Sequence, residues 1–131
     1  MIVFLDTSAI YALLSKGDTN HDRAVGLWEQ IASSSGGLVT QSYLVVEAAT
    51  LVQRRLGMEA VQVLYDEILP TVAVVWVDER LHDLASSAFR QAPRNLSLVD
   101  LVSFEVMREY KIRNAFSFDS DFTAHGFTMV P

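Results

Sequence analysis

Five acidic residues stand out by their surroundings in the chain: Asp6, Glu47, Asp100, Asp119 and Asp121. Asp6 ends the apolar run IVFL, and Asp119 and Asp121 follow the alternating run AFSF, so three of the five come after segments with the character of β-strands. Carboxylate oxygens are the hard ligands that Mg²⁺ and Mn²⁺ prefer. If the fold gathers these side chains, the chemistry that they predict is metal-assisted hydrolysis.

Each of these acids except Glu47 also has a plain structural explanation. Asp6 is suited to cap the helix that follows it. Ser97 and Asp100 have the spacing of a capping box, in which each side chain accepts a hydrogen bond from the backbone of the other residue. Asp119 and Asp121 are common turn residues. Taken one at a time, these four acids favour structural roles.

Glu47 is harder to explain in this way. Its neighbours at three and four positions along the expected helix are Tyr43, Leu44, Thr50 and Leu51, and the nearest basic residue is seven positions away. An acid on a mostly apolar helix face is costly unless it is paired or bound to a cation. A salt bridge to a residue distant in sequence is therefore the structural alternative to a metal.

The elements that must position these acids alternate along the chain. Apolar runs predict strands at 2–5, 38–40, 72–77 and 115–118, and helical periodicity predicts helices at 9–15, 21–33, 42–56, 58–69, 79–91 and 97–110. Ser42 and Asp78 are the expected caps of two helices, and Gly57 ends one. Strands that are apolar on both sides and alternate with helices indicate a parallel sheet covered on both faces. We therefore expect an α/β fold, a single three-layer domain over residues 1–131 with a mostly parallel central sheet flanked by helices.

In such folds ligands gather at the carboxyl ends of the strands, beside a switch in strand order. Asp6 and Asp119 both end strands, so the sequence places them at that edge of the sheet. The same argument supports a shared pocket for the other acids.

The composition narrows the classes of protein further. The 131 residues include no cysteine, which excludes disulfides and thiolate zinc sites, and the three histidines lack zinc-site spacing. The net charge of −6 argues against nucleic acid as a partner. If five of the acids share one cavity, however, only 11 acids remain against 10 basic residues, and the rest of the surface is nearly neutral. No Walker, G-x-G-x-x-G or G-x-S-x-G motif is present. The apolar run 72–77 is too short to span a bilayer and no targeting segment is visible, so we expect a soluble, cytoplasmic protein.

The ordered set of motifs resembles the PIN-domain family, and most closely the VapC-type ribonuclease toxins. It consists of IVFLDTSAI, then Glu47 after TQSYLVV, then LSLVDLVSFEVMREYKIRNAFSFDSDF, and it covers essentially the whole chain. The resemblance implies a ribonuclease that depends on Mg²⁺ or Mn²⁺ and hydrolyses RNA phosphodiesters. It also implies a protein antitoxin as partner and assembly as a homodimer, or a larger assembly with the antitoxin.

By the same resemblance the acidic quartet of the family falls on Asp6, Glu47, Asp100 and Asp119. We assign Asp6, Asp100 and Asp119 as metal ligands, and Glu47 as a ligand or as the residue that orients a water on the metal. Ser117 matches the hydroxyl residue that often precedes the last acid. Strand alternation places Ser117 and Asp119 on one side of the strand, so we expect Asp119 to face the metal. Asp121 falls where the family often has a further acid of variable role. We expect it either to support the metal ligands or to lie in a turn, where it binds a backbone N–H while the next residue enters the core; whether it is itself a ligand stays open.

Two other functions remain open at this point. A phosphoacceptor receiver-like domain also has an acidic pocket at strand ends, but it expects paired acids after the first strand, an acceptor Asp after the third and a lysine after the fifth. Here only Asp6 follows the first strand, and Lys111 precedes a strand. A non-catalytic PIN-like binding module would keep the fold without the chemistry. The intact quartet favours the enzyme over this second alternative.

Overall fold

The strands of the computed structural model, which describes residues 1–131, form one five-stranded sheet. They are β1 (Val3–Leu5), β2 (Leu38–Gln41), β3 (Val72–Val75), β4 (Asn114–Phe116) and β5 (Thr128–Met129). The order across the sheet is β3-β2-β1-β4-β5, and all neighbours are parallel. The predicted parallel sheet is confirmed. Strand β5 was not predicted, because two residues are too few to leave a pattern in the sequence.

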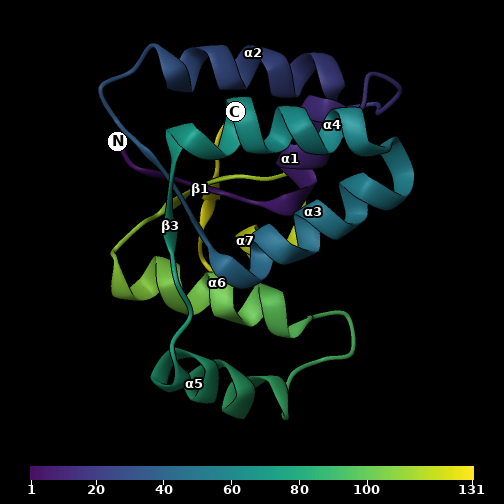
Figure 1. The fold of residues 1–131 in the computed structure, drawn as a ribbon. Helices are drawn as coiled ribbons and strands as arrows, with labels where there is room; N and C mark the ends of the chain where they lie inside the picture. The colour runs from purple at the N-terminus through teal and green to yellow at the C-terminus, as the bar shows by residue number, and fades with distance from the viewer.

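Helices cover both faces of this sheet. They are α1 (Thr7–Leu14), α2 (His21–Ala32), α3 (Ser42–Leu56), α4 (Met58–Val63), α5 (Glu79–Phe89), α6 (Leu98–Glu109) and the short α7 (Asp121–Ala124). In Figure 1, α2 and α4 lie on one side of the sheet, and α6 lies on the other side with α5 outside it. The expected three-layer α/β arrangement is confirmed.

A cluster of phenylalanines anchors the carboxyl-terminal part of the chain. Phe4, Phe104, Phe116 and Phe122 are fully buried, and the ring of Phe122 lies 5.2 Å from that of Phe104 and 6.2 Å from that of Phe4. Aromatic pairs at such distances add stability beyond the area that they bury. Phe122 enters the core as predicted, and it fixes the segment that carries Asp119 and Asp121.

The prediction of one continuous α-helix over 58–69 is wrong, because the segment changes its helical geometry along its length. Helix α4 ends at Val63, a π-helical segment η1 (Leu64–Ile68) follows, and a 3₁₀ segment η2 (Leu69–Thr71) leads into β3. The backbone N–H of Leu69 bonds to the carbonyl of Leu64, five residues back. Pro70 has no N–H and its ring obstructs a regular last turn, so the helix widens before it.

Two of the three expected helix boundaries hold. Asp78 caps α5 through a hydrogen bond from the N–H of Leu81, and Gly57, with a φ of 90°, ends α3. Ser42 is not the cap of α3; it is the first helical residue, and Gln41 caps the helix. A long amide side chain is an uncommon cap, which is why the sequence pointed to the serine beside it.

Candidate metal centre

Asp6 lies at the end of β1 and caps α1. Its Oδ2 accepts hydrogen bonds from the N–H of Ser8 at 3.3 Å, from Ser8 Oγ at 2.7 Å and from Ser117 Oγ at 2.9 Å. Its Oδ1 accepts none. Burial raises the pKa of Asp6 from its usual range to about 6, against the lowering effect of the serine hydrogen bonds. The structural role and an open carboxylate oxygen therefore coexist in this residue.

Glu47 lies in the middle of α3 and is held from α1. Thr7 Oγ1 donates a hydrogen bond to Glu47 Oε1 at 2.8 Å. The two ion pairs of the structure, Arg80–Glu109 and Arg108–Glu105, do not involve Glu47, so the salt-bridge alternative is wrong. Burial raises the pKa of Glu47, and the nearby charge of Asp100 adds to the rise.

Asp100 forms the expected capping box at the start of α6. The N–H of Ser97 donates to Asp100 Oδ2 at 3.0 Å, and the N–H of Asp100 donates to Ser97 Oγ at 3.1 Å. Burial raises the pKa of Asp100, and the charges of Asp119 and Asp121 add to the rise. Asp100 therefore caps its helix through one oxygen while it faces two other carboxylates.

Asp119, and not Asp121, binds the backbone of the turn that follows β4. Strand β4 ends at Phe116, so the strand alternation used to place Asp119 does not extend that far. Asp119 Oδ1 accepts the turn hydrogen bond, from the N–H of Asp121 at 3.0 Å. Asp121 starts α7, and its Oδ1 accepts from Asn95 Nδ2 at 3.2 Å. The expectation that Asp121 binds the backbone of the turn is wrong.

The topology explains why these acids meet. Strand β1 lies between β2 and β4, so the strand order switches between β1 and β4, and the segments after these two strands carry Asp6 and Asp119. Oxygen atoms of Asp100, Asp119 and Asp121 all lie within 4.8 Å of one another. Asp100 links this group to Asp6 and Glu47, because its charge contributes to the raised pKa of both. The structure thus brings all five predicted acids to one edge of the sheet.

Gln41 joins the two helices that carry Glu47 and Asp100. Its Oε1 accepts from the N–H groups of Tyr43 at 2.7 Å and Leu44 at 3.2 Å. Its Nε2 donates to Val99 O at 3.2 Å and Ser103 Oγ at 3.1 Å. A fully buried amide that satisfies these groups fixes the start of α3 against α6.

The donor set fits a hard divalent cation. Each of the five carboxylates uses a single oxygen for hydrogen bonds within the protein: Oδ2 of Asp6 and Asp100, Oε1 of Glu47, and Oδ1 of Asp119 and Asp121. The other five oxygens accept no hydrogen bond, and no lysine or arginine pairs with the group. Crowded carboxylates without a basic partner are stabilised by a cation.

The sequence did not identify Thr7, Ser8 and Asn95, which bind these carboxylates, or Gln41, which fixes the helices that carry two of them. Thr7 and Ser8 directly follow Asp6, so two hydroxyl residues next to an acid were the available signal. Gln41 and Asn95 act across distant segments, which a single sequence does not reveal.

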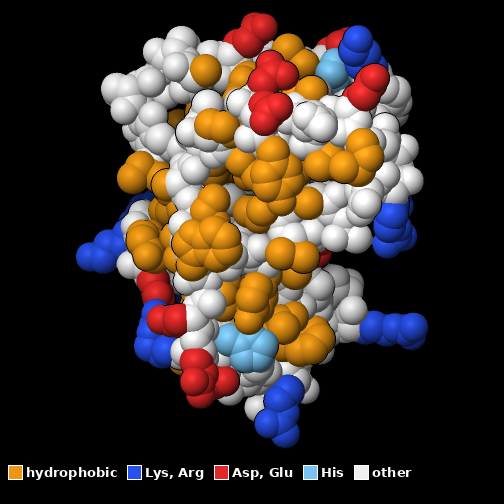
Figure 2. Space-filling view, in the orientation of Figure 1, with side chains coloured by type: hydrophobic (Ala, Val, Ile, Leu, Met, Phe, Trp, Pro, Cys, Tyr) orange, Lys and Arg blue, Asp and Glu red, His pale blue; other side chains and the backbone are white.

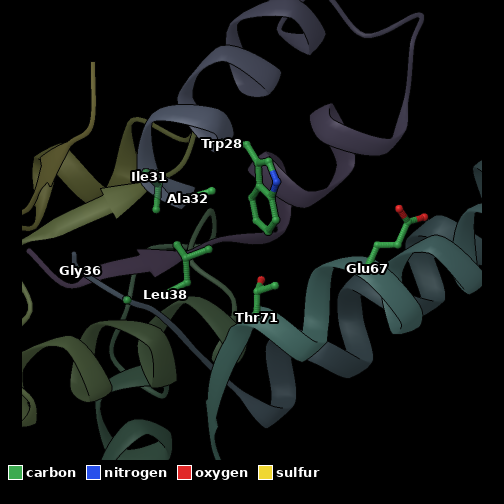
Figure 3. Close-up of a pocket in the computed structure, with 8 residues that line it drawn as sticks. Trp28, Ile31, Ala32, Gly36, Leu38, Glu67 and Thr71 are labelled. Atoms are coloured by element: carbon green, nitrogen blue, oxygen red, sulfur yellow. The ribbon is translucent and has the colours of Figure 1, made fainter. Parts of the chain in front are cut away.

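An apolar cavity lies away from the acids, between α2 and the start of β2. Figure 3 shows Trp28, Leu38, Thr71 and Glu67 around this space of about 330 Å³. A second cavity of about 310 Å³ shares Trp28 and Glu67 with it. These cavities offer apolar surface with an acidic rim, and they contain none of the five acids.

None of the helices combines the length and the apolar character needed to cross a membrane.

Comparison with known proteins gives consistent matches. The PIN domain family model matches residues 3–127. The 23S rRNA-specific endonuclease VapC20 of two Mycobacterium tuberculosis strains is 38% identical over 133 residues, which covers 98% of both chains. The crystal structure of Mycobacterium tuberculosis VapC20, described as a Sarcin-Ricin loop cleaving toxin, matches with a TM-score of 0.87 and 36% identity, over 99% of this chain and 98% of that one. FitAcB from Neisseria gonorrhoeae matches with a TM-score of 0.69 and 18% identity, over 100% and 97% of the two chains, and this supports the fold alone.

Proposed function

The chain belongs to the PIN domain family, and from this premise we propose that it is an endoribonuclease that depends on Mg²⁺ or Mn²⁺ and acts as the toxin of a toxin–antitoxin pair. One observation carries the proposal. Five carboxylates meet at the switch in strand order, and each leaves one oxygen free of hydrogen bonds. We assign Asp6, Asp100 and Asp119 as metal ligands and add Asp121, because its oxygen lies in the same 4.8 Å group as Asp100 and Asp119.

A divalent cation, when bound, supplies charge stabilisation at the phosphate and acidifies water for attack. The side chains of the protein orient the carboxylates that would hold the cation and the water. Ser8 and Ser117 fix Asp6 through one oxygen, so its other oxygen keeps a constant orientation. Thr7 fixes Glu47 in the same manner, which leaves Glu47 Oε2 to accept a proton from the attacking water.

The two alternative functions have weaker support. In a receiver-like domain the acceptor Asp follows the third strand and lies in the acidic pocket. Here the acid after β3 is Asp78, which caps α5 and lies outside the acidic group. A non-catalytic binding module has no use for five open carboxylates, which are costly without a cation. The experiment below separates this module from the enzyme.

We propose 23S rRNA as the first substrate to test, because the relatives of known activity are named for it. Purified protein incubated with 23S rRNA and Mg²⁺ or Mn²⁺ should produce discrete cuts that primer extension locates, and EDTA should prevent them. Intact RNA under all conditions, with folded protein, would leave the non-catalytic module as the better description.

The partners follow from the same proposal. The cavities around Trp28 are apolar with an acidic rim formed by Glu29 and Glu67, so they suit an antitoxin segment that carries apolar and basic side chains. An RNA substrate and a protein antitoxin place the activity in the cytoplasm. Exposed apolar side chains, among them Val46 and Trp76, support a homodimer.

A further inference from the structure

Two arginines rest on aromatic rings beside the acidic centre. The guanidinium carbon of Arg23 lies 5.6 Å from the centre of the Phe118 ring, and that of Arg55 lies 5.8 Å from the centre of the Tyr11 ring. Both arginines are exposed, and both rings are half-buried. Such contacts hold a guanidinium in place without using its N–H donors.

Arg23 is tied to the acidic centre through Phe118. Phe118 lies between Ser117 and Asp119, and its backbone N–H donates to Ser8 Oγ at 2.9 Å. Ser8 Oγ in turn donates to Asp6 at 2.7 Å. The ring that carries Arg23 thus belongs to the loop that shapes the site.

Arg55 is connected to the acidic centre through the contact between α1 and α3. Thr7 of α1 binds Glu47 of α3, and Tyr11, one helical turn after Thr7, contacts Arg55. Arg55 follows Glu47 by eight residues, or about 12 Å along a helix axis. Figure 1 shows that α2 begins and α3 ends on the side toward which β1 points, the side where Asp6 lies.

The donors of both arginines are free. The two ion pairs of the structure use Arg80 and Arg108, and the side chains of Arg23 and Arg55 form no hydrogen bond within the protein. A centre of five acids repels the phosphates on either side of the bond to be cut. Affinity for an RNA backbone therefore needs cations placed around that centre.

We infer that Arg23 and Arg55 bind phosphates of the RNA backbone near the acidic centre and thereby seat the strand for cleavage. The inference rests on the proposed function, since it names residues that bind its substrate. Because each guanidinium lies over an aromatic ring and pairs with no acid, its N–H donors are available to bind a phosphate.

The test measures RNA binding apart from catalysis. The probe is a fluorescein-labelled RNA hairpin that copies the sarcin–ricin loop of 23S rRNA, and EDTA prevents cleavage while fluorescence anisotropy is recorded at several salt concentrations. Arg23→Gln and Arg55→Gln should each weaken binding about three- to tenfold at low salt, and should reduce the slope of log K against log salt by roughly 0.7–0.9. Arg23→Lys and Arg55→Lys should keep most of the slope, because the charge remains.

Arg113→Gln is the matched control. Arg113 is exposed, forms no ion pair, and precedes β4, so it lies at the opposite edge of the sheet from Asp119. The control removes the same charge and should change affinity less than about twofold if position matters more than net charge. Equal losses in all three Gln variants, or none in Arg23→Gln and Arg55→Gln while the wild type still cleaves, would overturn the inference alone. A wild type that cuts no RNA would instead overturn the proposed function.

Discussion

Asp6, Asp100 and Asp119 show how one carboxylate can serve the fold and a ligand together. In each, one oxygen caps a helix or closes a turn, and the second oxygen accepts nothing from the protein. The structural explanations that the sequence offered for Asp6 and Asp100 are therefore correct, and they do not exclude a metal role. A cap needs one acceptor, whereas a carboxylate has two.

The raised pKa of Asp6 predicts how stability depends on pH without metal. The pKa of its carboxyl group rises from an ordinary 3.8 to about 6 in the folded protein, so between these pH values the folded state binds more protons than the unfolded state. Protonation of Asp6 therefore stabilises the fold by up to roughly 3 kcal/mol. This stabilisation is complete below the pKa of the unfolded state and is lost as the pH rises through the pKa of the folded state. Burial shifts Glu47 and Asp100 in the same direction.

Thermal unfolding in EDTA should therefore give a lower melting temperature at pH 7.5 than near pH 5, and Mn²⁺ should reverse most of the decrease at pH 7.5. Asp6→Asn should flatten the pH dependence. A melting temperature that rises steadily from pH 5 to pH 7.5 in EDTA would show that burial does not raise the pKa of Asp6 as the structure implies.

Among the elements, the start of α3 depends on one buried side chain. Gln41→Ala removes the cap from the N–H groups of Tyr43 and Leu44 and leaves Ser103 Oγ without its amide donor. Loss of a cap and of buried hydrogen bonds should lower the free energy of unfolding by about 2–4 kcal/mol. Urea denaturation measures the change. Thr50→Ala, which removes an exposed hydroxyl bond later in α3, is the control and should cost less than about 1 kcal/mol.

The elements also show which parts of the fold the sequence could predict. Apolar runs between helices predicted four of the strands and the parallel sheet, because burial on both faces favours apolar residues in those strands. The same reasoning placed Asp6 and Asp119 at one edge. The cap at Gln41 and the π-helical end before Pro70 depend on contacts or local geometry that periodicity does not encode. The strand alternation used to place Asp119 does not apply, because β4 ends at Phe116, and the contact of Asp121 with Asn95 joins segments that are distant in the sequence.

At the scale of the whole molecule, exposed apolar side chains predict self-association. Val46, Trp76, Leu84 and Phe89 are 65%, 77%, 47% and 43% exposed. Figure 2 shows hydrophobic side chains gathered over β3, α3 and α4. Surfaces of this kind are commonly covered in an oligomer. Light scattering at micromolar concentration should report a dimer, and Val46→Arg should weaken it; a wild-type monomer at that concentration would remove the prediction.

RNA cleavage by Asp100→Asn is the most direct test of a catalytic acidic centre. Asparagine can still accept the N–H of Ser97 through its amide oxygen, so the capping box and the fold should survive while the negative charge is lost. Asp78→Asn changes the same residue type at another helix cap, outside the acidic group. With equal protein, saturating Mn²⁺ and matching melting curves, we predict that Asp100→Asn cleaves more than about 100-fold more slowly than wild type, beyond the loss typical for residues that only orient a ligand. Asp78→Asn should cleave within about twofold of wild type. Cleavage by Asp100→Asn at the wild-type rate would mean that Asp100 only caps its helix, and it would contradict the metal centre proposed here.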